Sequence, residues 1–160
     1  MPKTLVRPSR VRAIATALGC LVAATALAGT PPAHVEFLNS EAAAKAGLPF
    51  SEAVRNGDTI YLSGQVGTVP GTRTLVPGGF PAEARQALEN IRAILTAHGR
   101  TTADLVKCTV MLADMADWPA FNEIYVSFLK KPYPARSAIG ASGLALGARV
   151  EVECIASARN

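Results

Sequence analysis

Two stretches of this chain have the periodicity of amphipathic helices, whereas at least five have the pattern of β-strands, and this ratio limits the folds that the chain can adopt. The first helix is predicted over residues 81–98, with Pro81 at its start and Gly99 just past its end. The second helix follows Asp117, its predicted cap, and ends before Pro132. Two helices cannot cover both faces of a five- or six-stranded sheet, so we predict an α+β fold with both helices on one face. The other face must then meet solvent or another subunit.

The strands are predicted from the alternation of apolar and polar residues and from turn signals. Asn56 and Gly57 form a strong hairpin signal because both accept positive φ, and they join strands over residues 51–55 and 59–66. Residues 106–112 also alternate, and the even-numbered positions form the apolar face. Further short strands are predicted just before residue 38, over 137–140 and over 149–156. On the second helix, an aromatic stripe is interpreted as core packing: Trp118, Phe121, Tyr125 and Phe128.

The first 28 residues have the composition of a secretory signal peptide. Four basic residues and no acidic residue precede an apolar run over 13–28, which ends in the small-residue pattern Ala26-Leu27-Ala28. We therefore expect cleavage near Ala28, a folded domain over 29–160, and a periplasmic or secreted protein. The alternatives are a membrane anchor, although the run is shorter than the ~20 residues that span a bilayer, or an amphipathic first helix. Cys20 matches a lipid-attachment signal only weakly.

The charge of the chain lies mainly in this leading segment. The sequence holds 16 basic and 12 acidic residues, and four of the basic ones precede residue 13. Without them, twelve basic residues face twelve acidic ones, so the mature domain is formally neutral. A neutral domain lacks the basic excess of a phosphate-binding surface, which argues against a nucleic-acid partner and against ribonuclease activity.

Cys108 and Cys154 remain after removal of the leader, and each lies in an apolar strand pattern. The favoured interpretation is that both are small residues of the core, and the alternative is a disulfide between them. The sequence has two histidines and no Cys-x-x-Cys motif, so we expect no metal site.

One arginine and two glutamates stand out near the C-terminal end of the chain. Glu151 and Glu153 alternate with apolar residues, so both should face the uncovered side of the sheet. Arg136 lies at the start of the strand before, which we expect to be a neighbour. From this spacing alone, the favoured interpretation is a solvated strand face with a surface ion pair, worth ~0–1 kcal/mol.

Six short motifs resemble, in order, those of the Rid/YjgF family of reactive-intermediate deaminases. The resemblance covers the chain from about residue 35 to the C-terminus. The motifs are LSGQ (62–65), LENI (88–91), VKCTVML (106–112), FNEIY (121–125), YPARS (133–137) and VEVECIA (150–156). The resemblance implies a chorismate-mutase-like fold with a mixed β-sheet, assembled as a homotrimer with sites in clefts between subunits. It also implies hydrolysis of 2-imino or 2-enamino acids to 2-keto acids and ammonia, without a cofactor.

The resemblance assigns roles to individual residues. Arg136 is expected to bind the substrate carboxylate through two parallel N–H donors, and Glu151 to orient or activate the attacking water. Ser63 and Gly64 are expected along the pocket, and Asn122 matches a site asparagine of the family.

Two positions depart from the family pattern. Phe50 stands where a tyrosine is usual, and Ala138 where a cysteine is usual. Both changes remove polar groups near the substrate, which leaves open a second hypothesis. In that hypothesis the protein is a non-catalytic trimer that binds a small carboxylate or a partner protein. Retention of Arg136 and Glu151 favours the enzyme.

Overall fold

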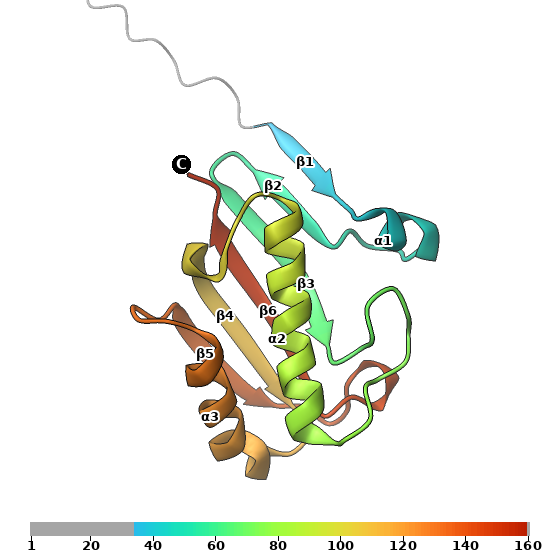
Figure 1. Cartoon of the computed structure of the whole chain (residues 1–160), viewed down its shortest axis with the longest axis vertical. Helices are drawn as coiled ribbons and strands as arrows, with labels where there is room; N and C mark the ends of the chain where they lie inside the picture. Colours follow the sequence, from blue (N-terminus) through green and yellow to red (C-terminus); the bar gives the residue numbers. More distant parts are fainter. Residues whose placement is uncertain (1–33, 160) are drawn as a thin grey trace, which may run out of the picture. The chain divides into compact units, whose positions relative to one another are not determined.

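The computed structural model describes residues 34–159, which form one six-stranded mixed sheet with helices packed against it (Figure 1). The strand order is β1-β2-β3-β6-β4-β5, and all neighbours are antiparallel except β4 and β5, which are parallel. The strands are β1 (Val35–Leu38), β2 (Ala53–Asn56), β3 (Thr59–Val66), β4 (Leu105–Leu112), β5 (Ala135–Gly140) and β6 (Val150–Ser157). The predicted signal peptide over residues 1–28 lies outside the described residues.

Two long helices cover one face of this sheet, as predicted. They are α2 (Phe80–Ala97) and α3 (Trp118–Phe128), and Figure 1 shows both on the same side of the strands. A short helix, α1 (Glu41–Ala46), precedes β2, and single 3₁₀ turns lie at Thr102–Asp104, Met115–Asp117 and Ala145–Gly147. None of the helices within residues 34–159 is both long and apolar enough to cross a membrane.

The core lies between α2, α3 and the covered face of the sheet. The predicted apolar face of α2 is buried throughout: Ala84, Leu88, Ile91 and Leu95 are each at most 2% exposed. The residues that meet it from the sheet include Val110, Leu112, Val150 and Val152, all with no exposed area. The helical and strand periodicities therefore correctly predicted which faces of these elements are buried.

The opposite face of the sheet carries no helix among the described residues. Phe37, Tyr61 and Ile139 lie there, and each exposes roughly half or more of its side chain, with Phe37 at 72%. Cross-strand pairing places Phe37, Val54 and Tyr61 in one row across three strands. We call this surface the open face. It is the face that we predicted to meet solvent or another subunit.

The prediction that Cys108 and Cys154 are free core residues is wrong. The two lie directly opposite each other on β4 and β6 and form a disulfide. The alternation along each strand correctly predicted that both side chains are buried. Their pairing, however, depends on the register between two strands, in which the two cysteines are 46 residues apart in the sequence. Closing a loop of this length restricts the unfolded chain and contributes about 4 kcal/mol in the loop-entropy account.

Two local predictions also need correction, and one short helix was missed. Asp117 occupies the N-cap position of α3, but its side chain makes no cap hydrogen bond, because its Oδ2 accepts a hydrogen bond of 2.7 Å from Arg149. Val106 is exposed and Leu105 is buried instead, since a register shift between Leu105 and Lys107 interrupts the alternation, which holds only from Cys108 to Leu112. Helix α1 was not predicted, because its six residues include none that is buried and so carry no apolar periodicity.

Candidate functional site

Arg136 lies on β5, the edge strand, and points to the helix-covered side of the sheet. It pairs in register with Cys108, which is buried beneath the helices. Its Nη2 donates a hydrogen bond of 2.7 Å to Oδ1 of Asn122 on α3. A guanidinium at a sheet edge, with one N–H held by an amide, keeps its other donors for a ligand.

Two aromatic rings of α3 lie against the same guanidinium. Cζ of Arg136 is 4.4 Å from the ring centroid of Trp118 and 4.6 Å from that of Tyr125. Burial raises the pKa of Tyr125, and the positive charge of Arg136 partly opposes this. The sequence interpretation of the aromatic stripe as core packing is confirmed, since Phe121 and Tyr125 are buried and Trp118 and Phe128 pack against the core, but it did not include the contacts with Arg136. The helical spacing of Trp118, Asn122 and Tyr125 around one face was the signal that could have revealed them.

Glu151 lies on β6 and faces the open side of the sheet. Its carboxylate lies directly over Gly64 of β3, where a Cβ atom would come within 2.0 Å of Oε1. Gly64 falls in a register shift between Leu62 and Gln65, which interrupts the pairing of β3 with β6. A glycine at an irregular strand position allows this close approach, so Gly64 makes room for the carboxylate.

The surroundings of the Glu151 carboxyl stabilise its protonated form relative to a glutamate that is fully exposed to water. Burial raises the pKa of the Glu151 carboxyl, and the nearby charge of Glu153 on the same face raises it further. A carboxylate with a raised pKa is a better proton acceptor near neutral pH than an ordinary surface glutamate.

Ser63 holds the segment before β2 against β3. Its N–H donates to the carbonyl of Glu52 at 2.9 Å, and its hydroxyl donates to the carbonyl of Ser51 at 2.7 Å. Phe50 directly precedes this segment and is 55% exposed. The hydroxyl of Ser63 is thus engaged with backbone, while the phenyl ring of Phe50 is available to a neighbouring group.

The structure does not bring Arg136 and Glu151 together within one chain. They lie on opposite faces, and β4 separates their strands, so the expectation that β5 and β6 are neighbours is wrong. Two groups result. We call Arg136, Asn122, Trp118 and Tyr125 the arginine half-site, and Glu151 and Gly64 the glutamate half-site, which Ser63 adjoins along the chain. Ala138 is on the arginine side, partly buried against the core.

Comparison with known families accounts for most of the chain. A family model described as Endoribonuclease L-PSP matches residues 40–158, which include both half-sites. The chain belongs to this family. The resemblance to Rid/YjgF proteins is thereby confirmed.

Several relatives carry the name of a deaminase. A mouse protein named 2-iminobutanoate/2-iminopropanoate deaminase is 49% identical over 108 residues, which cover 68% of this chain and 80% of the mouse chain. The human protein of the same name is 45% identical over 108 residues, with 68% and 79% coverage. An Arabidopsis thaliana relative, Reactive Intermediate Deaminase A, chloroplastic, is 38% identical over 122 residues, with 76% and 65% coverage.

Solved structures of Rid proteins share this fold. RidA from an Antarctic Psychrobacter superimposes with a TM-score of 0.67 at 38% identity, covering 80% of this chain and 99% of RidA. Escherichia coli TdcF, solved with bound serine, gives a TM-score of 0.66 at 33% identity, covering 71% and 90%.

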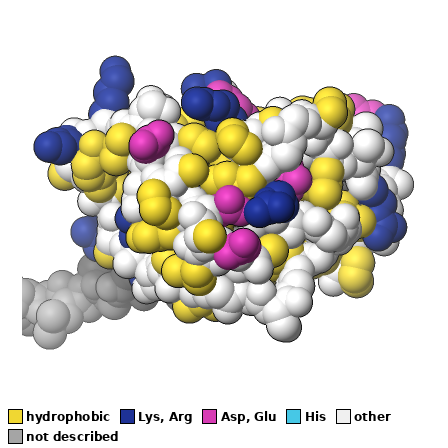
Figure 2. Space-filling model, turned by 90° about the horizontal axis from the view of Figure 1, so that it is seen from below, with side chains coloured by type: hydrophobic (Ala, Val, Ile, Leu, Met, Phe, Trp, Pro, Cys, Tyr) yellow, Lys and Arg dark blue, Asp and Glu magenta, His cyan; other side chains and the backbone are white. Residues whose placement is uncertain are grey.

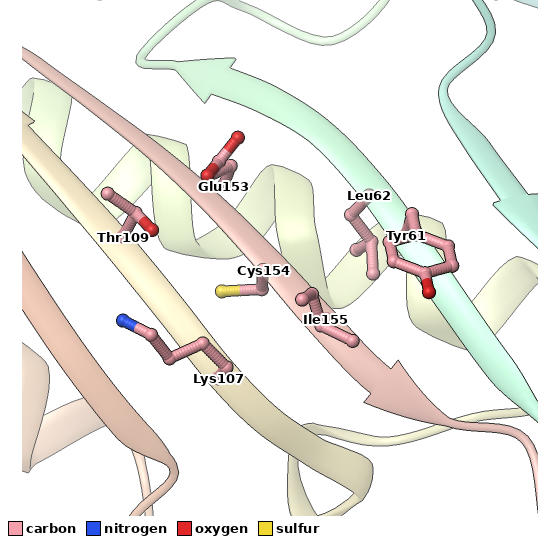
Figure 3. A pocket seen from close by; sticks show the side chains of 7 residues that line it. All are labelled: Tyr61, Leu62, Lys107, Thr109, Glu153, Cys154 and Ile155. Carbon is pink, nitrogen blue, oxygen red and sulfur yellow. The ribbon is translucent and has the colours of Figure 1, made fainter.

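A pocket of about 140 Å³ lies on the open face but contains neither Arg136 nor Glu151 (Figure 3). Lys107 lines it and donates a hydrogen bond of 2.7 Å to Oγ of Ser137 on β5. The pocket is lined by Tyr61, Leu62, Lys107, Thr109, Glu153, Cys154 and Ile155. The pocket is a hollow between side chains of the open face. Glu151, the candidate catalytic residue of this Rid-family chain, does not line it.

Charged side chains at the end of the domain seen in Figure 2 are interspersed. Basic side chains lie among acidic and hydrophobic ones there and do not gather into a patch. Arg149 is one basic residue that is paired with an acid, since its Nη2 donates to Oδ2 of Asp117 at 2.7 Å, and its backbone N–H donates to the buried Glu83 at 2.8 Å. Among residues 34–159, no group of three His, Cys, Asp or Glu side chains could hold a metal ion.

Substituting Gly64 with alanine should lower the turnover of any reaction that uses Glu151 by at least about tenfold, because the new methyl group displaces the carboxylate. Steady-state turnover and thermal unfolding would be measured together. Gly143→Ala is the matched control, since a Cβ atom added to Gly143 would have no neighbouring atom within 4 Å. Parent-like turnover in Gly64→Ala would show that the position of the Glu151 carboxylate is unimportant.

Proposed function

We propose that this protein hydrolyses reactive 2-imino and 2-enamino acids to 2-keto acids and ammonia. The main support is the combination of two groups. The Arg136 guanidinium is held in place at a sheet edge by Asn122 and Trp118, and the Glu151 carboxyl on the open face has a raised pKa. The relatives at 45–49% identity that are named 2-iminobutanoate/2-iminopropanoate deaminase support the same reaction.

The two half-sites imply that the complete site needs a second subunit. A β-sheet separates Arg136 from Glu151 in one chain, so the two can act on one small molecule when the edge strand of one copy approaches the open face of the next. We propose a closed homotrimer with three such clefts, as the family resemblance implies. The exposed apolar side chains on the open face would be buried by this assembly.

In the proposed mechanism, Arg136 binds the substrate carboxylate through two N–H donors and fixes the imine carbon near Glu151 of the neighbouring subunit. The Glu151 carboxylate takes a proton from a water molecule while the oxygen of that water bonds to the imine carbon. Glu151 returns this proton to the nitrogen of the adduct, and the C–N bond breaks. The departing ammonia takes up the hydroxyl proton as the C=O bond forms, which gives the 2-keto acid and ammonium. The protonated imine is already electrophilic, so positioning and proton transfer by these residues carry the reaction.

A coupled assay tests this function. An amino-acid oxidase generates imines from several amino acids, and their loss is followed with and without the purified mature protein. We expect imine loss to accelerate in proportion to protein concentration. No acceleration with any of the imines would contradict the proposal and favour the non-catalytic carboxylate-binding protein, which the named relatives do not favour.

The raised pKa of Glu151 predicts a limit to activity on the acid side of the pH profile. The carboxylate must be ionised to accept a proton, so kcat should fall as pH decreases through its raised pKa. Glu153→Gln removes one cause of the shift and should move this fall to lower pH, with little change in kcat at neutral pH. The pH dependence of kcat in the two proteins provides the measurement, and an unmoved acid limb would exclude Glu151 as the titrating base.

We also propose that the protein is exported and that its mature form starts near Gly29. The composition of residues 1–28 supports this, and so does the disulfide between Cys108 and Cys154, because disulfides persist mainly outside the reducing cytoplasm. Mass spectrometry of protein from the native host should show a chain without its first 28 residues. A soluble cytoplasmic chain that retains Met1 would contradict export.

A further inference from the structure

We propose that Trp118 and Tyr125 form an aromatic clamp that positions Arg136 for carboxylate binding and so sets the affinity of the site. The inference rests on the proposed function, since it assigns the carboxylate-binding step to Arg136. It adds two positioning residues, neither of which would touch the substrate.

The guanidinium of Arg136 lies over the rings of both clamp residues. Trp118 and Tyr125 both lie within the ~6 Å of a cation–π contact, at 4.4 Å and 4.6 Å. Asn122, between them on the same face of α3, holds one N–H at 2.7 Å. An unrestrained arginine loses much rotamer freedom when it binds a ligand, whereas this arginine has lost that freedom before the ligand arrives.

The clamp is itself fixed to the core. Phe121 is fully buried and stacks on Trp118 with a centroid distance of 6.1 Å, and it contacts Tyr125 at 5.6 Å. Tyr125 is only 3% exposed, and its hydroxyl has no hydrogen-bond partner among the described residues. Its ring, not its hydroxyl, therefore makes the contact with Arg136 that the proposal uses.

Trp118 is the sole tryptophan of the sequence, so its fluorescence reports directly on the clamp. A guanidinium over an indole ring changes the emission of that indole, and a carboxylate that binds the guanidinium changes it again. Butanoate serves as the probe because it carries the carboxylate of a substrate and does not absorb in the emission range.

The experiment compares three variants of the mature protein. Trp118→Leu removes the ring, and Trp118→Phe restores an aromatic ring. Phe128→Leu is the matched control, because Phe128 is also a partly buried aromatic of α3 packed on the core, but its ring lies 5.2 Å from Arg92 instead. Butanoate affinity is measured by calorimetry for all proteins and by tryptophan emission where the tryptophan remains. KM and kcat for imine hydrolysis and thermal unfolding are measured alongside.

We expect Trp118→Leu to weaken butanoate binding and raise KM by about three- to thirty-fold, the range that a cation–π contact gives, with a much smaller change in kcat. Trp118→Phe should recover most of the affinity, and Phe128→Leu should match the parent. Butanoate should change the emission of the parent protein in a saturable way.

The outcomes separate this inference from the proposed function. If the parent hydrolyses imines but Trp118→Leu keeps the parent KM and affinity, the clamp is wrong and the function stands. If the parent binds butanoate in a Trp118-dependent way but hydrolyses nothing, the clamp stands and the function is wrong. Absence of both binding and hydrolysis in the parent overturns both.

Discussion

Replacing Arg136 with methionine should reduce kcat/KM for imine hydrolysis by about 10²- to 10⁴-fold, since two charge-assisted hydrogen bonds of about 1.5–3 kcal/mol each are lost. Methionine keeps much of the length and volume of the side chain, so packing against Trp118 and Tyr125 should survive. Arg136→Lys keeps the charge without the two parallel donors, and we expect a smaller loss of at least about tenfold.

Arg92 offers a matched control for this substitution. It also places its guanidinium over an aromatic ring of α3, that of Phe128, but it lies outside both half-sites. Arg92→Met should therefore leave kcat/KM near the parent value. Equal activity of Arg136→Met and Arg92→Met would show that Arg136 does not bind the substrate.

Substituting Glu151 with glutamine should lower kcat by about 10²- to 10⁴-fold and change KM much less. Glutamine preserves the shape over Gly64, but its amide cannot accept a proton from water, and general base catalysis is worth this range. Steady-state kinetics at a fixed neutral pH separates the two parameters. The corresponding change at Glu153, which is on the same face but more exposed, should have little effect on kcat at that pH. A large rise in KM with unchanged kcat would instead make Glu151 a binding group.

Local sequence patterns predicted the elements of this fold well. The spacing of apolar residues located α2 and its buried face, and the turn at Gly57, which has φ 57°, joins β2 to β3 as expected. These features depend on residues that are near one another in the chain, so periodicity and turn chemistry are sufficient.

Features that depend on long-range pairing were not predictable in the same way. The insertion of β4 between β5 and β6, and the pairing of Cys108 with Cys154, are set by strand order and register across the sheet. The site residues were identified by motif, but the motif could not show that Arg136 and Glu151 lie on opposite faces. The alternation of residues predicted which face of the sheet Glu151 lies on, but it gave no face for Arg136. The contacts of Arg136 with α3 show that it lies on the helix-covered face.

Mixing two inactive variants tests the composite site most directly. Arg136→Met and Glu151→Gln subunits are co-assembled with different affinity tags, and the mixed oligomers that carry both tags are isolated and assayed for imine hydrolysis. If each site takes Arg136 from one subunit and Glu151 from the next, every mixed closed trimer has about a third of its sites intact. The account predicts activity near that fraction of the parent value. Mixed oligomers no more active than the two separate variants would contradict a site shared between subunits.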